Sequence, residues 1–89
     1  MKRFYIIFKG QVQGVGFRWT AAQIAYKYNL TGWVRNLDDG DVELQIQGNE
    51  NELYQALKEL QTSRRYIIID DYFVKEIKTV EESTFDIKF

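Results

Sequence analysis

Two segments, 17–28 and 50–62, carry apolar residues at helical spacing, and each lies between segments rich in β-branched and aromatic residues. The strand-like segments cover 4–9, 31–37, 41–47, 66–78 and 85–89. The predicted order is therefore β-α-β-β-α-β-β. Right-handed crossovers would place both helices on one face of a mainly antiparallel sheet. The sequence thus predicts an α+β fold, the ferredoxin-like two-layer sandwich.

The chain has 89 residues, which allows a single domain over residues 1–89. Apolar residues make up 45% and charged residues 28%, as in ordinary globular proteins. The apolar run that starts the chain is too short for a signal peptide, and no run is long enough to span a membrane. We therefore expect a cytoplasmic protein with no membrane partner, and its small size suggests a monomer.

The chain contains no Cys, no His and no Pro. Thiol nucleophiles, Ser-His-Asp triads and zinc sites built on His or Cys are therefore excluded. A chain without Cys also has no disulfide, which is compatible with the cytosol. Any catalysis must use Arg, Lys, carboxylates, Tyr, amides or the backbone.

Charge is distributed unevenly along the chain although the net charge is only −1. Residues 1–40 hold six basic and two acidic residues, giving +4, whereas residues 41–89 hold six basic and eleven acidic residues, giving −5. The small net charge argues against a nucleic-acid partner. A small anion would prefer the first half of the chain.

A glycine-rich loop joins the first strand to the first helix. Gly10, Gly14 and Gly16 permit backbone conformations that direct several N–H groups into one concavity, which is a common way to bind anions. Arg18 follows in the first helical turn, where the helix dipole disfavours a cation unless an anion compensates it. The alternative is that the glycines only turn the chain and that Arg18 is solvated.

The segment GQVQGVGFR at 10–18 resembles the first acylphosphatase signature. The segment GWVRN at 32–36, followed by Gly40, Val42 and Gly48, resembles the second. The chain is therefore similar to the acylphosphatase family, in particular to its small stand-alone bacterial members. Two positions depart from the usual pattern: Phe8 replaces a smaller aliphatic residue, and residues 62–65 replace a Gly-Pro turn.

The resemblance implies hydrolysis of acyl phosphates to a carboxylate and inorganic phosphate, without cofactor or metal. It assigns phosphate binding to Gln13, Gly14, Val15, Gly16 and Phe17. It makes Arg18 and Asn36 the catalytic residues, with Arg18 holding the phosphate and Asn36 positioning the attacking water. From its position at the end of a strand alone, Asn36 could instead be a turn-capping amide.

A non-catalytic domain that senses phosphate or an acyl phosphate, or regulates by binding it, is the main alternative function. RNA recognition is disfavoured because the strand 41–47 offers no aromatic residue for base stacking.

Several other residues have structural interpretations. We expect Trp19 and Trp33 to be packing groups and the acidic residues at 38–41 to form a solvated turn. Arg64 and Arg65 before the apolar run at 66–69, and the two aspartates after it, suit protection of an edge strand against aggregation.

Overall fold

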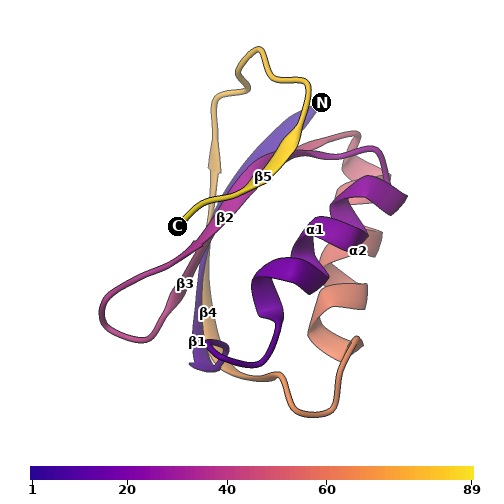
Figure 1. The fold of residues 1–89 in the computed structure, drawn as a ribbon. Helices are drawn as coiled ribbons and strands as arrows, with labels where there is room; N and C mark the ends of the chain where they lie inside the picture. The colour runs from indigo at the N-terminus through magenta and orange to yellow at the C-terminus, as the bar shows by residue number, and fades with distance from the viewer.

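The computed structural model describes all 89 residues as two helices on one face of a five-stranded sheet (Figure 1). The elements are β1 (Lys2–Gln11), α1 (Phe17–Lys27), β2 (Thr31–Asn36), β3 (Val42–Gly48), α2 (Glu50–Thr62), β4 (Ile68–Ile77) and β5 (Phe85–Ile87). This order and layering confirm the predicted α+β sandwich.

The sheet has the strand order β4-β1-β3-β2-β5, and every pairing is antiparallel except the parallel pairing of β2 with β5. Val42 at the start of β3 pairs with Phe8 of β1 on one side and with Asn36 of β2 on the other. The loop after β1 and the end of β2 therefore lie at the same end of the sheet. This register positions the site described below.

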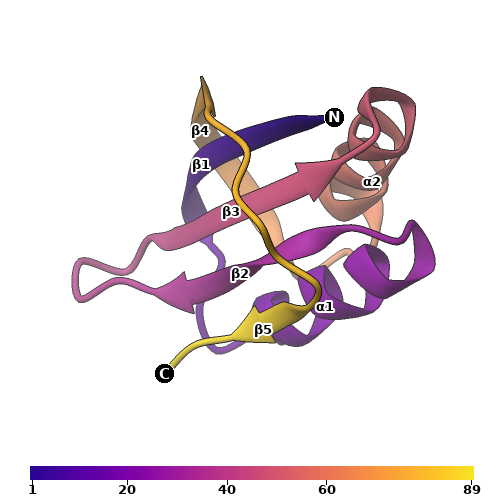
Figure 2. The same ribbon diagram turned by 90° about the horizontal axis from the view of Figure 1, so that it is seen from above.

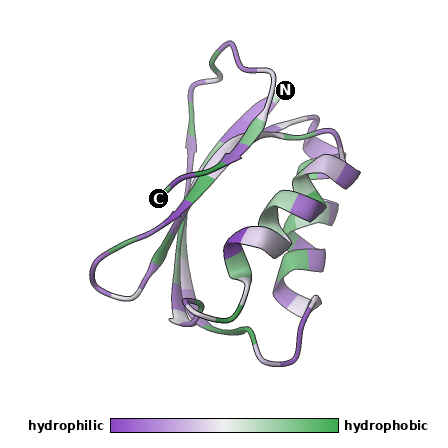
Figure 3. Cartoon of the chain, viewed as in Figure 1, coloured by the Kyte–Doolittle hydropathy of each residue, from purple (hydrophilic) through white to green (hydrophobic).

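The core lies between the sheet and the helices, as hydrophobic residues along both layers indicate (Figure 3). Alternate residues of β1 point into it, including Ile6 and Phe8, and α1 contributes Phe17 and Ala25. The rings of Phe8 and Phe17 pack with their centroids 5.1 Å apart. The unusual Phe8 thus joins β1 to the first turn of α1.

The other face of the sheet is partly covered by the segment that leads from β4 to β5, which crosses β3 and β2 in Figure 2. Arg3 lies beneath this segment and is only 2% exposed. Its guanidinium donates to Glu82 at 2.8 Å and to Gln45 at 2.8 Å. A buried guanidinium needs such partners, so this network fixes the crossing segment. Sequence reasoning did not anticipate it.

Several strand boundaries differ by one or two residues from those predicted, and the end of β1 and the start of β4 are the most informative. β1 continues to Gln11 because its pairing with β4 resumes, with a shifted register, after Lys9. β4 begins at Ile68 rather than at residue 66, because the N–H of Ile67 donates to the carbonyl of Arg64 and closes a turn. β4 is an edge strand, as expected, and Asp70 and Asp71 follow its apolar start, as the prediction had them.

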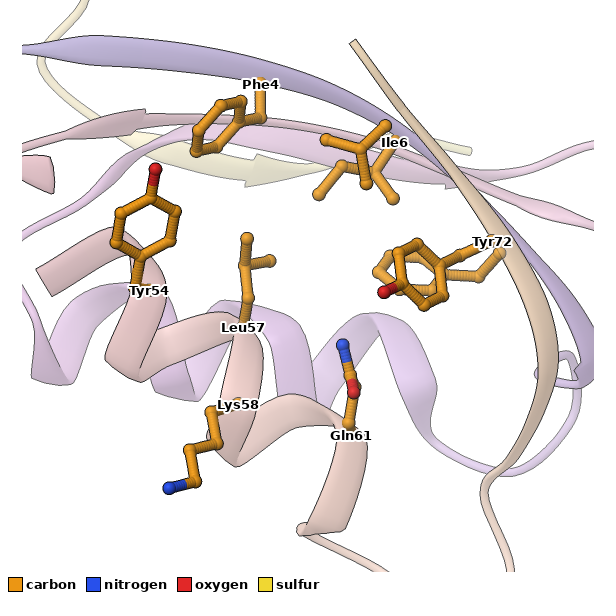
Figure 4. A pocket seen from close by; sticks show the side chains of 9 residues that line it. Phe4, Ile6, Tyr54, Leu57, Lys58, Gln61 and Tyr72 are labelled. Atoms are coloured by element: carbon orange, nitrogen blue, oxygen red, sulfur yellow. The ribbon is translucent and has the colours of Figure 1, made fainter. Parts of the chain in front are cut away.

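A cavity of about 450 Å³ lies between α2 and strands β1 and β4. Figure 4 shows Phe4 and Ile6 of β1 facing Leu57 of α2 across it, with Tyr72 of β4 at one side. The amine of Lys58 points away from the cavity in this view. The cavity is therefore mainly apolar and offers no cation to an anionic ligand. Neither helix is long and apolar enough to cross a membrane.

Candidate active site

The glycine-rich loop turns the chain from β1 into α1 through two left-handed residues. Gly14 has φ 73° and Gly16, the N-cap of α1, has φ 78°. No side chain caps this helix start, and no acidic residue lies in its first turn. As a result, no backbone N–H from Gln13 to Trp19 donates to an acceptor within the protein. These donors and the positive end of the helix dipole form an anion-binding arrangement.

Arg18 is half-buried beside these amides. Its guanidinium makes a long hydrogen bond, 3.4 Å, to the carbonyl of Lys88 and lies 4.9 Å from the centre of the Phe89 ring. No carboxylate pairs with it, because the ion pairs of the protein involve other cations: Lys2, Arg3, Lys9, Lys27 and Arg35. The charge of Arg18 is therefore free to compensate a bound anion.

Asn36 ends β2 at the same edge of the sheet. Its Oδ1 is buried and has no hydrogen-bond partner. The adjacent turn is closed by other groups: Asp39 accepts from the N–H of Asp41 at 3.0 Å, and Leu37 donates to the carbonyl of Asp41 at 2.9 Å. The Asn36 side chain makes no hydrogen bond to this turn, so the geometry gives no support to its alternative interpretation as a turn-capping amide.

Gln13 joins the glycine loop to the β2–β3 turn. Its side-chain Nε2 donates to the carbonyls of Leu37 and Asp41, both at 2.7 Å. The side chain of Gln13 is thus committed to structure, and only its backbone N–H is available for an anion. Because this contact joins residues far apart in the sequence, no local pattern could have indicated it.

A cavity of about 250 Å³ brings the site residues together. It is lined by Val12, Gly14, Gly16, Phe17, Arg18, Trp19, Asn36, Ile87 and Phe89. Gln13 and Val15 do not line it; the Val15 side chain packs against the core instead. Arg18 is the only ionisable side chain among the lining residues, so it is the one side-chain cation that the cavity offers to an anion.

The two tryptophans near the signature segments differ from each other. Trp19 lines the cavity and is 54% exposed, so its interpretation as a packing group is wrong. Its place in the first helical turn, next to Arg18, leaves it at the cavity rim. Trp33 is half-buried on β2 and lies beneath two cations, with Arg35 at 5.5 Å and Lys88 at 4.4 Å from its ring centre.

The acidic residues at the β2–β3 turn do not form a metal site, and no group of three or more acidic side chains is placed to hold a metal ion. Asp41 forms an ion pair with Lys9 at 2.6 Å, and this hydrogen bond raises the pKa of Lys9 above its ordinary value. The turn acids are therefore accounted for by hairpin geometry and one ion pair.

Comparison with known proteins agrees with this geometry. The acylphosphatase family profile matches residues 4–87. An acylphosphatase of Bacillus licheniformis is 44% identical over 81 residues, covering 91% of this chain and 90% of its own length. One of Clostridium acetobutylicum is 38% identical over 90 residues, covering 100% and 99%. The crystal structure of an acylphosphatase from Bacillus subtilis superposes with a TM-score of 0.93 at 37% identity, covering all of both chains. The chain belongs to the acylphosphatase family.

Proposed function

We propose that this protein hydrolyses acyl phosphates with the cavity at the start of α1 as its active site. The backbone N–H groups of Gln13, Gly14, Val15, Gly16 and Phe17 hold the phosphoryl group together with Arg18, and Asn36 orients the attacking water. The observation that carries this proposal is the run of free N–H groups beside an unpaired guanidinium.

Phosphoryl transfer requires positioning and stabilisation of the charge that spreads over the equatorial oxygens. Backbone amide donors held by the fold can provide both with little reorganisation, and a guanidinium beside them adds a full positive charge. The guanidinium also offers paired donors that match two phosphate oxygens. The geometry around Arg18 thus suits the transition state as well as the bound substrate.

Asn36 has an unpartnered oxygen and an amide donor at the cavity. A neutral amide can orient a water without taking its proton. The water oxygen then forms a bond to phosphorus while the bond from phosphorus to the acyl oxygen breaks, and its electron pair leaves with the carboxylate. One proton of the water passes to a phosphate oxygen, so the dianionic substrate yields a carboxylate and dihydrogen phosphate.

This reaction needs no general acid because the leaving carboxylate has a pKa of about 4 and departs as an anion. It can therefore proceed in a chain that has no His and no Cys. We further infer that residues 1–89 act as one domain, and that the protein works as a monomer in the cytoplasm, where the lack of Cys is no disadvantage.

The decisive test of Arg18 is hydrolysis of benzoyl phosphate by wild-type protein, Arg18→Ala and Arg18→Lys. We expect turnover to fall by about 10²–10³ in Arg18→Ala, the usual cost of losing a donor to a developing anion. Arg18→Lys should also fail because an ammonium cannot reproduce the paired donors. Arg65→Ala is the matched control, because Arg65 is exposed in the connection between α2 and β4, does not line the cavity and forms no ion pair.

Near-normal turnover in either Arg18 variant would show that Arg18 is not part of the active site. Wild-type protein that binds inorganic phosphate but does not turn over would instead establish the alternative, a domain that senses or regulates by binding.

Asn36→Ala tests the role of the amide separately. We expect turnover to fall while inhibition by inorganic phosphate is retained, because Asn36 acts on the water rather than on the phosphate. Stability should not fall, since the substitution removes a buried oxygen without a partner. Full turnover with lowered stability would show that Asn36 has only a structural role.

A further inference from the structure

The cavity has an apolar side that phosphate binding does not use. Trp19, Ile87 and Phe89 line it beyond the glycines and Arg18. Trp19 is more than half exposed although it is the largest apolar side chain of α1. Phe89 is fully exposed at the same cavity, so two aromatic side chains offer apolar surface beside the anion site, and aromatic side chains commonly line ligand pockets.

Trp19 is held in place by the connection that departs from the family pattern. The guanidinium of Arg64 lies 5.3 Å from the centre of a Trp19 ring, within the range of a cation–π contact. The same guanidinium donates to Thr20 Oγ1 at 3.0 Å and to the hydroxyl of Tyr66 at 2.9 Å. Contacts with Trp19, Thr20 and Tyr66 therefore hold the Arg64 guanidinium in place, and the guanidinium limits the movement of the Trp19 indole on one side.

We propose that Trp19, held by Arg64, forms with Ile87 and Phe89 a subsite for the acyl group of the substrate. The subsite gives the enzyme a preference for acyl phosphates with aromatic or other bulky apolar acyl groups over acetyl phosphate. This inference rests on the proposed function, because it assumes that the phosphoryl group lies at the glycines and Arg18.

The size and chemistry of the cavity support this assignment. At about 250 Å³ it is slightly smaller than the clefts that hold drug-sized ligands, about 300–1,000 Å³, and suits a phosphoryl group with a compact acyl group. The indole is a rigid apolar surface whose position Arg64 fixes beforehand, so little is lost in ordering it when substrate binds. Trp19 would thus determine specificity, and Arg64 would act as a positioning residue.

The test compares kcat and KM for benzoyl phosphate and acetyl phosphate. In Trp19→Ala we expect the preference for benzoyl phosphate in kcat/KM to fall about tenfold, within the range for losing apolar contacts in a pocket. The change should appear in KM for benzoyl phosphate, while kcat and the acetyl phosphate values change little. Arg64→Ala should shift the preference in the same direction but less, and Arg64→Lys should retain part of it.

Trp33→Ala is the matched control, because Trp33 also lies beneath two cations but does not line the cavity. It should leave the preference unchanged. Inhibition by inorganic phosphate should be the same in all these variants, since it involves only the glycines and Arg18. An unchanged preference in Trp19→Ala, or an equal loss for both substrates, would overturn the proposal.

A binding measurement that needs no turnover separates this inference from the proposed function. By calorimetry, wild-type protein should bind phenylphosphonate more tightly than methylphosphonate, and Trp19→Ala should reduce the difference. If both bind equally to wild-type protein, the acyl subsite is wrong even where acyl phosphates are hydrolysed. If phenylphosphonate is preferred but no acyl phosphate is hydrolysed, the subsite holds and the proposed function fails.

Discussion

Gly14 and Gly32 both have positive φ, yet their surroundings differ. A Cβ on Gly32, φ 137°, would overlap the carbonyl oxygen of Gln45 on the neighbouring strand. A Cβ on Gly14, φ 73°, would meet nothing within 4 Å, because Gly14 borders the cavity. Gly32 therefore allows two strands to approach each other, whereas Gly14 keeps space free in front of the amides.

Alanine substitution should separate these two roles. Gly32→Ala should lower the free energy of unfolding by about 2–4 kcal/mol, through backbone strain and displacement of β3. Gly14→Ala should cost only about 1–2 kcal/mol for the left-handed conformation but should reduce turnover at least about tenfold, since its methyl group adds bulk at the cavity wall. Urea unfolding and the kinetics of benzoyl phosphate hydrolysis measure the two effects.

Gly40 provides the control for this comparison. It has φ 96° and equally open surroundings, but it lies in the β2–β3 turn and does not line the cavity. Gly40→Ala should lower stability as Gly14→Ala does and leave turnover intact. Equal losses of turnover in the two variants would contradict the role assigned to Gly14.

At the scale of secondary structure, Glu59 of α2 forms hydrogen bonds with two residues at the end of α1. Glu59 of α2 accepts from Lys27 Nζ at 2.8 Å and from the hydroxyl of Tyr28 at 2.9 Å. The bond from Lys27, followed by that from Tyr28, holds the pKa of Glu59 below its ordinary value. A lowered pKa in the folded state means that the stabilisation is complete above the ordinary glutamate pKa and is lost as the pH falls through the folded value.

The stability difference between wild-type protein and Glu59→Gln should therefore be largest near neutral pH and disappear on acidification below the ordinary glutamate range. It should also shrink in high salt, because the ion pair between Lys27 and Glu59 is accessible to solvent. Urea midpoints across the acid range measure it. Glu52→Gln, which removes an acidic residue of α2 without an ion pair, serves as the control. A difference that stays constant down to low pH would contradict this role of Glu59.

The sequence was sufficient to predict the elements where periodicity is long. Leu53, Ala56 and Leu60 recur at helical spacing and are the buried residues of α2. The start of β4 was not predictable in the same way. Ile67 is buried at 6% exposure, but it belongs to a turn, and apolar composition alone does not distinguish such a residue from one in a strand.

In the candidate site too, features set by neighbouring residues could be predicted from the sequence, whereas features set by contacts between distant segments could not. Glycine spacing and Arg18 are local features, so the anion-binding loop could be predicted directly. The approach of Asn36 depends on the register of β1, β3 and β2, which the residues alone did not give; the resemblance to a family named Asn36 without its register. The bridging role of Gln13 and the exposed position of Trp19 depend on contacts with distant segments, and neither was anticipated.

At the scale of the whole molecule, the site draws on elements from both halves of the chain. β1 and α1 supply the loop, β2 supplies Asn36, and the segment after β5 supplies the carbonyl that Arg18 contacts. One hydrophobic cluster of 19 buried residues supports all of them. Because these parts come together only in the folded chain, an anion that binds the site must stabilise the fold as a whole.

Inorganic phosphate should therefore raise the unfolding temperature of the wild-type protein. At a phosphate concentration of about a hundred times Kd, mass action adds about 2.7 kcal/mol, which corresponds to about 10–20 °C for a domain of this size. Differential scanning calorimetry measures the shift, with chloride at matched ionic strength to correct for salt. In Arg18→Ala only the general effect of phosphate on protein stability should remain, whereas Arg65→Ala should respond as the wild type does. An equal rise in Arg18→Ala and wild-type protein would mean that phosphate acts through the solvent or through another surface, and the loop at the start of α1 would then not be the anion site.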